Sequence, residues 1–331
     1  EIFNLISLLY IIYLMIRVII YENEISSQEV SIIFNYSVVF QNNLGWLFTN
    51  YSYIENLMIS MERCIRYTKI EGEKFDKSIN NEELIKENWP NEGKIEFINY
   101  SVRYRPNTEV VLKNINLRIK SGEKIGIVGR TGSGKSTFCL SLFRILESLE
   151  GKIIIDDVDI SQIDLHFLRQ KITFIPQETC LFEGNLKYNL DPLNEFSDNE
   201  LLDVIKKIGI EFNDEDNILN KKIESNGINI SLGERQLICI GRAFLKKSKI
   251  IVMDEATANI DIKTEEKVQK VLNELLKNCT VITIAHRIKT IINYDKILVL
   301  EKGEIQEFDS PKNLIEQNTL FYREFYSKIN N

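Results

Sequence analysis

One short segment brings together glycines, a lysine and a serine at a spacing suited to holding phosphate groups. Residues 129–136 read G-R-T-G-S-G-K-S, the pattern G-x-x-x-x-G-K-S. The apolar segment 124–128 before it predicts a strand, and the segment 137–143 after it predicts a helix. Glycines let backbone N–H groups approach phosphate oxygens, and the helix N-terminus adds a favourable dipole. We therefore predict a phosphate-binding loop, in which Lys135 reaches the phosphates and Ser136 holds Mg²⁺.

A second apolar run, residues 250–253, ends in two adjacent carboxylates, Asp254 and Glu255. A buried parallel strand of this kind delivers a carboxylate to the edge of a sheet. Asp254 suits a role as a Mg²⁺ ligand, and Glu255 is placed one step further on to polarise a water molecule.

Two further residues permit both a functional and a structural interpretation. Ser231 stands before a helical run, with Gly233 two residues on, which suits a second anion-binding helix terminus. An ordinary N-cap explains Ser231 equally well. His286 follows the predicted strand 280–285. A lone histidine is most often structural, although ligands bind at the strand ends of such sheets.

Composition limits the class of protein that carries these motifs. The chain has 331 residues, 44% of them hydrophobic and 27% charged, which predicts a globular protein of about two domains. Its net charge of −7 disfavours nucleic-acid binding. Five cysteines without C-x-x-C spacing indicate reduced thiols and no zinc site. The chain opens inside an apolar run without an initiator methionine, so we expect a fragment of a longer protein.

Two apolar runs, residues 2–21 and 30–54, precede the motifs. Each is long enough for a helix that crosses a bilayer, which takes about 20 residues. We predict a transmembrane helix pair with a cytoplasmic extension over residues 1–69. The alternative is a pair of buried helices in a soluble domain, because the second run is interrupted by the amides of Asn35, Gln41, Asn42 and Asn43. In a membrane, these amides would face a bundle interior or a pathway, or simply pack the bundle.

The residues after the second run set the expected orientation and the domain boundaries. A basic cluster formed by Arg63, Arg66 and Lys69 places that side in the cytoplasm. Residues 70–92 are polar and charged and predict a linker into a new domain, residues 93–331.

The motifs in this order resemble the nucleotide-binding domain of ATP-binding-cassette (ABC) transporters. The similarity covers residues 93 to about 328, and the two apolar runs match the final transmembrane helix pair of such a transporter. Finer features resemble the second nucleotide-binding domain of the multidrug-resistance-associated (C) subfamily, among them Trp89-Pro90, residues 93–97 and residues 189–192. The resemblance implies an α/β P-loop NTPase fold with a mixed β core and a helical subdomain, preceded by two α-helical transmembrane segments.

The resemblance also assigns roles to matching positions. Tyr104 would stack on adenine, and Tyr100 is the less favoured candidate for this role. The alternative for each of the two is an ordinary tyrosine of the hydrophobic core. Glu255 would be the general base, His286 would contact the γ-phosphate, and Asp261 would communicate across a cassette dimer. The catalytic set would be Glu255, His286, Lys135 and Gln177, and the Mg²⁺ set would be Ser136, Gln177 and Asp254. Nucleotide contacts would come from Tyr104, Gly129, Arg130, Thr131, Gly132, Ser133, Gly134, Lys135, Ser136, Thr137, Ser231 and Gly233. For Arg130, surface exposure is as plausible as a phosphate contact.

The sequence departs from the family pattern at two places. Residues 230–234 read I-S-L-G-E where the commonest signature reads L-S-G-G-Q, and Ala258 replaces a serine. Family cassettes pair head to tail, so Ser231 and Gly233 would cap ATP held by a partner cassette. We expect the site on this chain's own phosphate loop to hydrolyse ATP, and the site capped by Ser231 to turn it over poorly.

The resemblance implies ATP-driven export of organic anions, conjugates or drugs, with ATP and Mg²⁺ as cofactors. The expected partners are the first cassette of the same polypeptide, the lipid bilayer and a small-molecule cargo, but no nucleic acid. The protein would be a multi-pass membrane protein with its cassette in the cytoplasm. One alternative is a nucleotide-gated channel or channel regulator of the same family. A second is a soluble cassette ATPase that acts on DNA or ribosomes, which the apolar runs and the acidic charge disfavour.

Overall fold

The computed structural model describes residues 2–20, 26–70, 72–73, 81–210, 218–254, 262–285 and 288–326. The chain divides into two compact units, Glu1–Lys74 and Phe75–Asn331. Each unit is described by itself.

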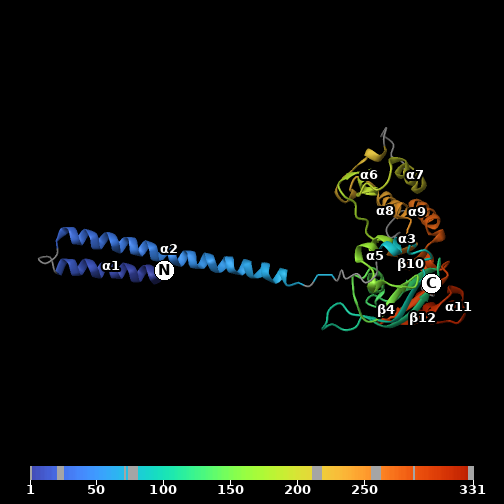
Figure 1. Ribbon diagram of the computed structural model, residues 1–331, viewed down its shortest axis with the longest axis horizontal. Helices are drawn as coiled ribbons and strands as arrows, with labels where there is room; N and C mark the ends of the chain where they lie inside the picture. Colours follow the sequence, from blue (N-terminus) through green and yellow to red (C-terminus); the bar gives the residue numbers. More distant parts are fainter. Residues whose placement is uncertain are drawn as a thin grey trace. The chain divides into compact units, whose positions relative to one another are not determined.

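The first unit is a pair of helices, α1 (Ile2–Ile20) and α2 (Ser27–Thr68), which lie side by side (Figure 1). Ser26 caps α2, because its hydroxyl accepts the N–H of Glu29 and the Glu29 carboxylate accepts the N–H of Ser26. No side chain of α2 is buried within the described residues. Helical structure over both apolar runs is thus observed.

The prediction that both runs cross a membrane is not supported. Within the described part of the chain, no helix is both long enough and apolar enough to span a bilayer. In α2, polar amides lower the hydropathy at Asn35, Gln41, Asn42 and Asn43.

The second unit is built on a mixed sheet with the strand order β12-β11-β3-β10-β9-β6. Its strands are β3 (Lys124–Val128), β6 (Ile172–Ile175), β9 (Ile250–Asp254), β10 (Thr280–Ile284), β11 (Lys296–Glu301) and β12 (Glu304–Asp309). All neighbouring pairs are parallel except β11 and β12. The central strand β10 is buried at every residue, and its sequence T-V-I-T-I consists wholly of β-branched side chains, which favour strands.

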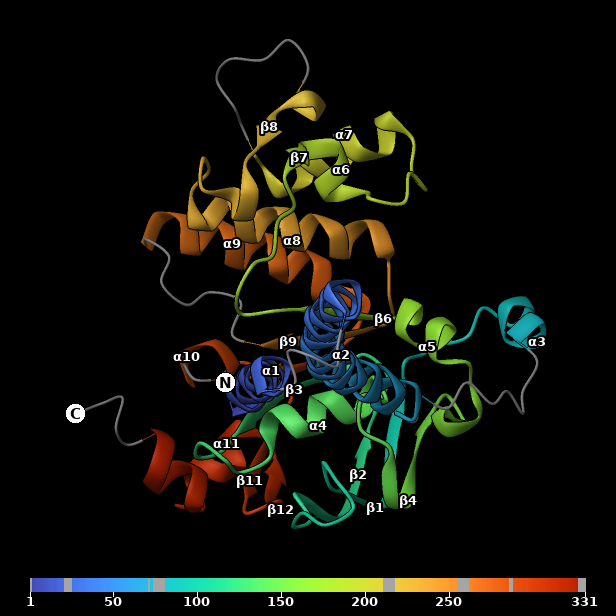
Figure 2. The ribbon, with the colours of Figure 1, turned by 90° about the vertical axis from the view of Figure 1, so that its left-hand side faces the viewer.

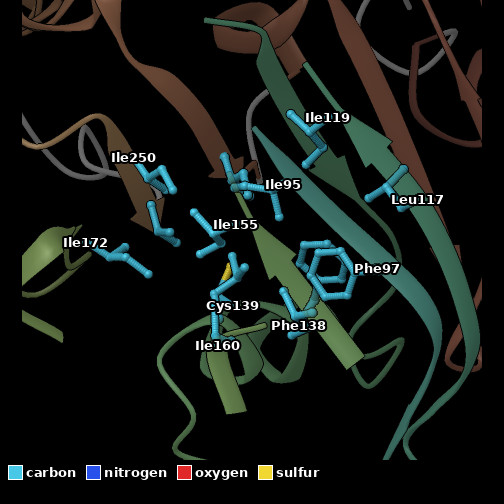
Figure 3. Packing of buried hydrophobic residues seen from close by; sticks show 14 of the residues in the cluster. Ile95, Phe97, Leu117, Ile119, Phe138, Cys139, Ile155, Ile160, Ile172 and Ile250 are labelled. Atoms are coloured by element: carbon cyan, nitrogen blue, oxygen red, sulfur yellow. The ribbon is translucent and has the colours of Figure 1, made fainter. Parts of the chain in front are cut away.

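A smaller antiparallel sheet packs with this one around helix α4 (Lys135–Leu142). Its order is β2-β1-β4-β5, from β1 (Ile95–Val102), β2 (Leu112–Ile119), β4 (Ser148–Ile155) and β5 (Val158–Asp159). Phe138 of α4 stacks on Phe97 of β1 with ring centroids 4.5 Å apart, and both are buried (Figure 3). This cluster fixes α4, and with it the loop that precedes α4.

A helical subdomain lies beyond the mixed sheet (Figure 2). It contains α6 (Leu186–Leu190), α7 (Asp198–Ile208), α8 (Leu232–Lys246), α9 (Ile262–Leu275), and the paired short strands β7 (Gly184–Asn185) and β8 (Lys222–Ile223). Its apolar cluster includes Leu201 and Ile205 of α7 and Ile238 of α8. The predicted mixed β core with a helical subdomain is therefore confirmed.

Short elements complete the second unit. The helices are α3 (Asn81–Lys86), α5 (Leu165–Lys171), α10 (Ile288–Ile291) and α11 (Pro311–Glu316), with single turns η1 (Ile160–Gln162), η2 (Ile218–Asn220), η3 (Ser225–Gly227), η4 (Leu276–Asn278) and the π-helical η5 (Tyr322–Tyr326). Fully buried Phe321 anchors the C-terminal elements against β11. Trp89 is also buried, and its indole N–H donates to the carbonyl of Ile155 at 3.0 Å.

Candidate nucleotide site

The candidate residues gather because the strands that carry them are neighbours and parallel. The order β3-β10-β9-β6 brings four carboxyl ends to one edge of the mixed sheet. The phosphate loop follows β3, Asp254 ends β9, and Gln177 lies just beyond β6 with its side chain exposed. Parallel sheets bind ligands at this edge.

Three predicted residues lie outside the described part of the chain. Glu255 directly follows β9, His286 follows β10 by two positions, and Asp261 directly precedes α9. Their roles stay predictions.

The glycines of the phosphate loop are required by its geometry. A Cβ on Gly129 would come within 2.3 Å of the Leu300 carbonyl oxygen. Gly134 has φ +106°, and a Cβ there would meet the Leu112 side chain at 2.8 Å. Gly134 is also the residue before α4, so its left-handed conformation turns the chain into the helix.

Lys135 points back into the phosphate loop. Its ammonium donates to the carbonyl oxygens of Gly129 at 2.7 Å and Arg130 at 3.2 Å. Burial lowers the pKa of Lys135, while the charge of Asp254 acts in the opposite direction. The ammonium is thus partly desolvated, which favours pairing with an incoming anion.

The loop fits a phosphate group. Within the described part of the chain, the buried Ser133 hydroxyl has no hydrogen-bond partner, an arrangement that costs free energy until a ligand supplies one. Ser136, the first-turn residue of α4, is exposed, so its hydroxyl is accessible for a metal ion. The start of α4 adds its dipole to the same place. The buried Ser133 hydroxyl, the Lys135 ammonium and the N-terminus of α4 together suit a phosphate group that carries a divalent cation.

The structure separates the two tyrosine candidates. Tyr100 is 3% exposed and belongs to the core, where burial raises its pKa. Tyr104 is 51% exposed, and its hydroxyl lies 3.0 Å from the Thr137 hydroxyl on α4. Tyr104 therefore stands beside the phosphate loop with an accessible ring, as a residue that stacks on a base requires.

Arg130 has a partner that the sequence did not indicate. Its guanidinium donates to both carboxylate oxygens of Glu324, at 3.1 Å and 2.7 Å. Glu324 lies in η5 near the C-terminal end of the described chain. No local pattern links positions 194 residues apart, so only the fold discloses this ion pair.

Ser231 is the N-cap of α8 and forms a capping box with Glu234. The Glu234 carboxylate accepts hydrogen bonds from the Ser231 N–H at 2.8 Å and hydroxyl at 2.7 Å, and the Glu234 N–H donates back to that hydroxyl at 3.2 Å. Ser231 is exposed, while Gly233 is buried. The N-cap interpretation is confirmed, and the Ser231 donors are engaged within the chain.

The mixed sheet, the phosphate loop at its edge and the separate helical subdomain define a P-loop nucleotide-binding cassette. Residues 112–258 match the family model described as "ABC transporter". The chain belongs to this family.

Its relatives are members of subfamily C. The chain is 44% identical to "Bile pigment transporter 1" of Saccharomyces cerevisiae over 321 residues, which covers 91% of the chain and 20% of that protein. It is 42% identical to "ATP-binding cassette sub-family C member 3" of Rattus norvegicus (92% of the chain, 20% of the relative). It is also 42% identical to "ATP-binding cassette sub-family C member 2" of Homo sapiens (96% and 21%). The chain thus spans about a fifth of the length of the curated relatives it matches.

Proposed function

We propose that the cassette binds ATP with Mg²⁺ and hydrolyses it to drive export across a membrane. The observation that carries the proposal is the phosphate loop. There the Lys135 ammonium lies near Asp254, and the buried Ser133 hydroxyl has no hydrogen-bond partner among the described residues, so both groups are available to a bound phosphate. The identity to subfamily C transporters over nine-tenths of the chain supports the same function.

Each residue contributes a distinct task. Lys135 draws the phosphates into the loop, and Tyr104 offers its exposed ring to the base. Ser136, Asp254 and Gln177 supply the oxygen ligands that Mg²⁺ prefers. When bound, Mg²⁺ neutralises phosphate charge.

In the proposed reaction, Glu255 accepts the proton of the attacking water. Glu255 follows Asp254 at the end of β9 and is the proposed general base. His286, beyond β10, would contact the γ-phosphate and stabilise charge that develops there.

The cassette would act as one half of a pair. Ser231 and Gly233 would cap ATP held by the first cassette of the same polypeptide, with Asp261 communicating across the interface. The capping box leaves Ser231 bonded to an anionic carboxylate, which supports slow turnover at that second site.

The names of the relatives support a proposal for the cargo class. One relative is named for bile pigment, and we propose that this protein exports organic anions or conjugates. The protein would be a membrane protein with the cassette in the cytoplasm.

Transport into inside-out membrane vesicles that contain the full-length protein tests this function. We expect uptake of a glutathione or glucuronide conjugate against its gradient with ATP, no uptake with a non-hydrolysable ATP analogue, and none for Lys135→Ala. If the conjugate instead moved only down its gradient, and did so with the non-hydrolysable ATP analogue as well as with ATP, the protein would be a nucleotide-gated channel.

A further inference from the structure

Tyr104 lies on the loop of residues 103–111, which connects β1 to β2. Residues 104–109 of this loop are all exposed. The Val111 N–H donates to the Val102 carbonyl at 2.9 Å and closes the base of the loop. This bond fixes the course of the backbone, but it does not fix the direction of the Tyr104 ring, because a side chain can occupy several staggered rotamers.

A hydrogen bond to α4 supplies the orientation of the ring. The Tyr104 hydroxyl lies 3.0 Å from the Thr137 hydroxyl. Thr137 directly follows Ser136 on α4, and the stacking of Phe138 on Phe97 fixes this helix. The bond therefore links an exposed ring on a loop to the rigid helix that carries the phosphate loop.

The burial of Thr137 distinguishes it from its neighbour Ser136. Ser136 is exposed, whereas Thr137 is 4% exposed. Successive residues of an α-helix point about 100° apart, so the two side chains leave α4 in different directions. A phosphate in the loop can reach the Ser136 hydroxyl, whereas the Thr137 hydroxyl is covered and bonded to Tyr104. The resemblance to ABC cassettes places Thr137 among the nucleotide contacts, but this geometry gives its hydroxyl a different task.

An aromatic ring strengthens nucleotide binding when its face meets the base. Immobilising a mobile side chain costs free energy at the moment of binding, and a ring that is already held avoids this cost. The bond between the Tyr104 and Thr137 hydroxyls supplies such a restraint.

We propose that Thr137 is a positioning residue for the base: its hydroxyl holds the Tyr104 ring in place for adenine and does not bind a phosphate. This inference rests on the proposed function, because it requires ATP at the phosphate loop. It ties recognition of the base to α4, next to the proposed Mg²⁺ ligand Ser136.

Competition binding with the full-length protein in lipid nanodiscs tests the inference. A fluorescent ATP analogue reports occupancy, and the site followed is the one that Lys135→Ala weakens. Unlabelled ATP or inorganic tripolyphosphate, which has phosphates but no base, displaces the analogue in the presence of Mg²⁺. We expect Thr137→Val to weaken ATP binding by roughly three- to tenfold, the loss that one hydrogen bond accounts for, and to leave the affinity for tripolyphosphate unchanged.

Further variants isolate the bond between the two hydroxyls. Tyr104→Phe keeps the ring and should give the same selective loss. The double variant Thr137→Val/Tyr104→Phe should lose no more than either single variant, because each change removes the same bond. Thr137→Ser keeps a hydroxyl and should restore ATP affinity towards the wild-type value.

Thr173→Val is the matched control. Thr173 is also buried, and its hydroxyl lies 2.7 Å from the Ser248 hydroxyl, but it is near the amino end of β6, away from the phosphate loop. This variant should leave both affinities unchanged.

Three results would overturn the inference. The first is equal weakening of ATP and tripolyphosphate by Thr137→Val in a protein as thermally stable as wild type, because the hydroxyl would then bind a phosphate. The second is wild-type ATP affinity in Thr137→Val or in Tyr104→Phe, and the exposed position of Tyr104 keeps this test valid if Thr137→Val fails to fold. The third is losses that add in the double variant. Failure of the proposed function is a separate result, in which Lys135→Ala changes the binding of neither ligand.

Discussion

At the scale of single residues, the geometry of the phosphate loop restricts which side chains its positions can carry. Gly129 has no room for a side chain, and the buried Ser133 hydroxyl has no hydrogen-bond partner among the described residues. Lys135 occupies the loop with hydrogen bonds to its carbonyls, so a phosphate would exchange those contacts for stronger, charge-assisted ones.

Replacing Lys135 by alanine should weaken ATP binding by roughly tenfold or more, because a charge-assisted hydrogen bond to phosphate is lost. A fluorescent ATP analogue titrated into the full-length protein measures this. Lys120→Ala, at an exposed lysine in the same unit, is the control. Unchanged affinity in Lys135→Ala would mean that the loop does not hold the nucleotide.

Glu234 is the residue that departs most informatively from the family signature. Replacing it by glutamine keeps a side-chain oxygen for the capping box. The change removes a negative charge beside the expected position of the phosphates of the ATP held by the partner cassette. Glu234→Gln should therefore raise ATP affinity at the second, Ser231-capped site.

Two-site nucleotide titration measures that change. The matched control is Glu200→Gln, because Glu200 forms the same capping box with Ser197 on α7. If both variants behave like wild type, the carboxylate of Glu234 does not act on the nucleotide.

At the scale of elements, α4 carries the loop and is fixed by its packing against β1. Phe138→Ala should lower the free energy of unfolding by about 3–5 kcal/mol, because a buried ring is lost and a cavity remains. Denaturant-induced unfolding of the second unit within the full-length protein, followed by loss of nucleotide binding, measures this. Phe182→Ala, at a half-exposed ring, should cost far less. Similar losses in both would contradict the packing described for α4.

The ion pair between Arg130 and Glu324 ties the phosphate loop to η5. Glu324→Gln should slightly lower the thermal stability of the cassette at low salt, and the difference from wild type should vanish at high salt, because the Arg130 side chain is 70% exposed and screened by ions. A thermal shift that persists unchanged at high salt would show that Glu324 acts through packing and not through charge.

The elements also show where sequence reasoning succeeds and where it stops. The phosphate loop, its flanking strand and helix, and the strand that ends in Asp254 follow from local patterns, because apolar periodicity and glycine spacing act over a few residues. The choice between Tyr100 and Tyr104, and the partner of Arg130, depend on contacts between distant segments. Both apolar runs form helices, but their length alone overstated their fit to a membrane, since no helix in the described part of the chain is also apolar enough to span one.

At the scale of the whole molecule, the chain is a cassette of the ABC transporter family with a helix pair before it. Sequence order predicts which residues belong to the nucleotide site, because parallel strands bring their carboxyl ends to one edge. The hydrogen bond between Tyr104 and Thr137 has no sequence motif, since the two residues lie 33 positions apart in separate elements.

Phosphate release by the full-length protein in lipid, compared between wild type and Glu255→Gln, tests the central claim most directly. We expect wild type to release phosphate and Glu255→Gln to be slower by about 10²–10⁴-fold while it still binds ATP, because a general base is lost. Equal rates in the two proteins, or no release by wild type although ATP is bound, would contradict the account of this cassette as an ATPase.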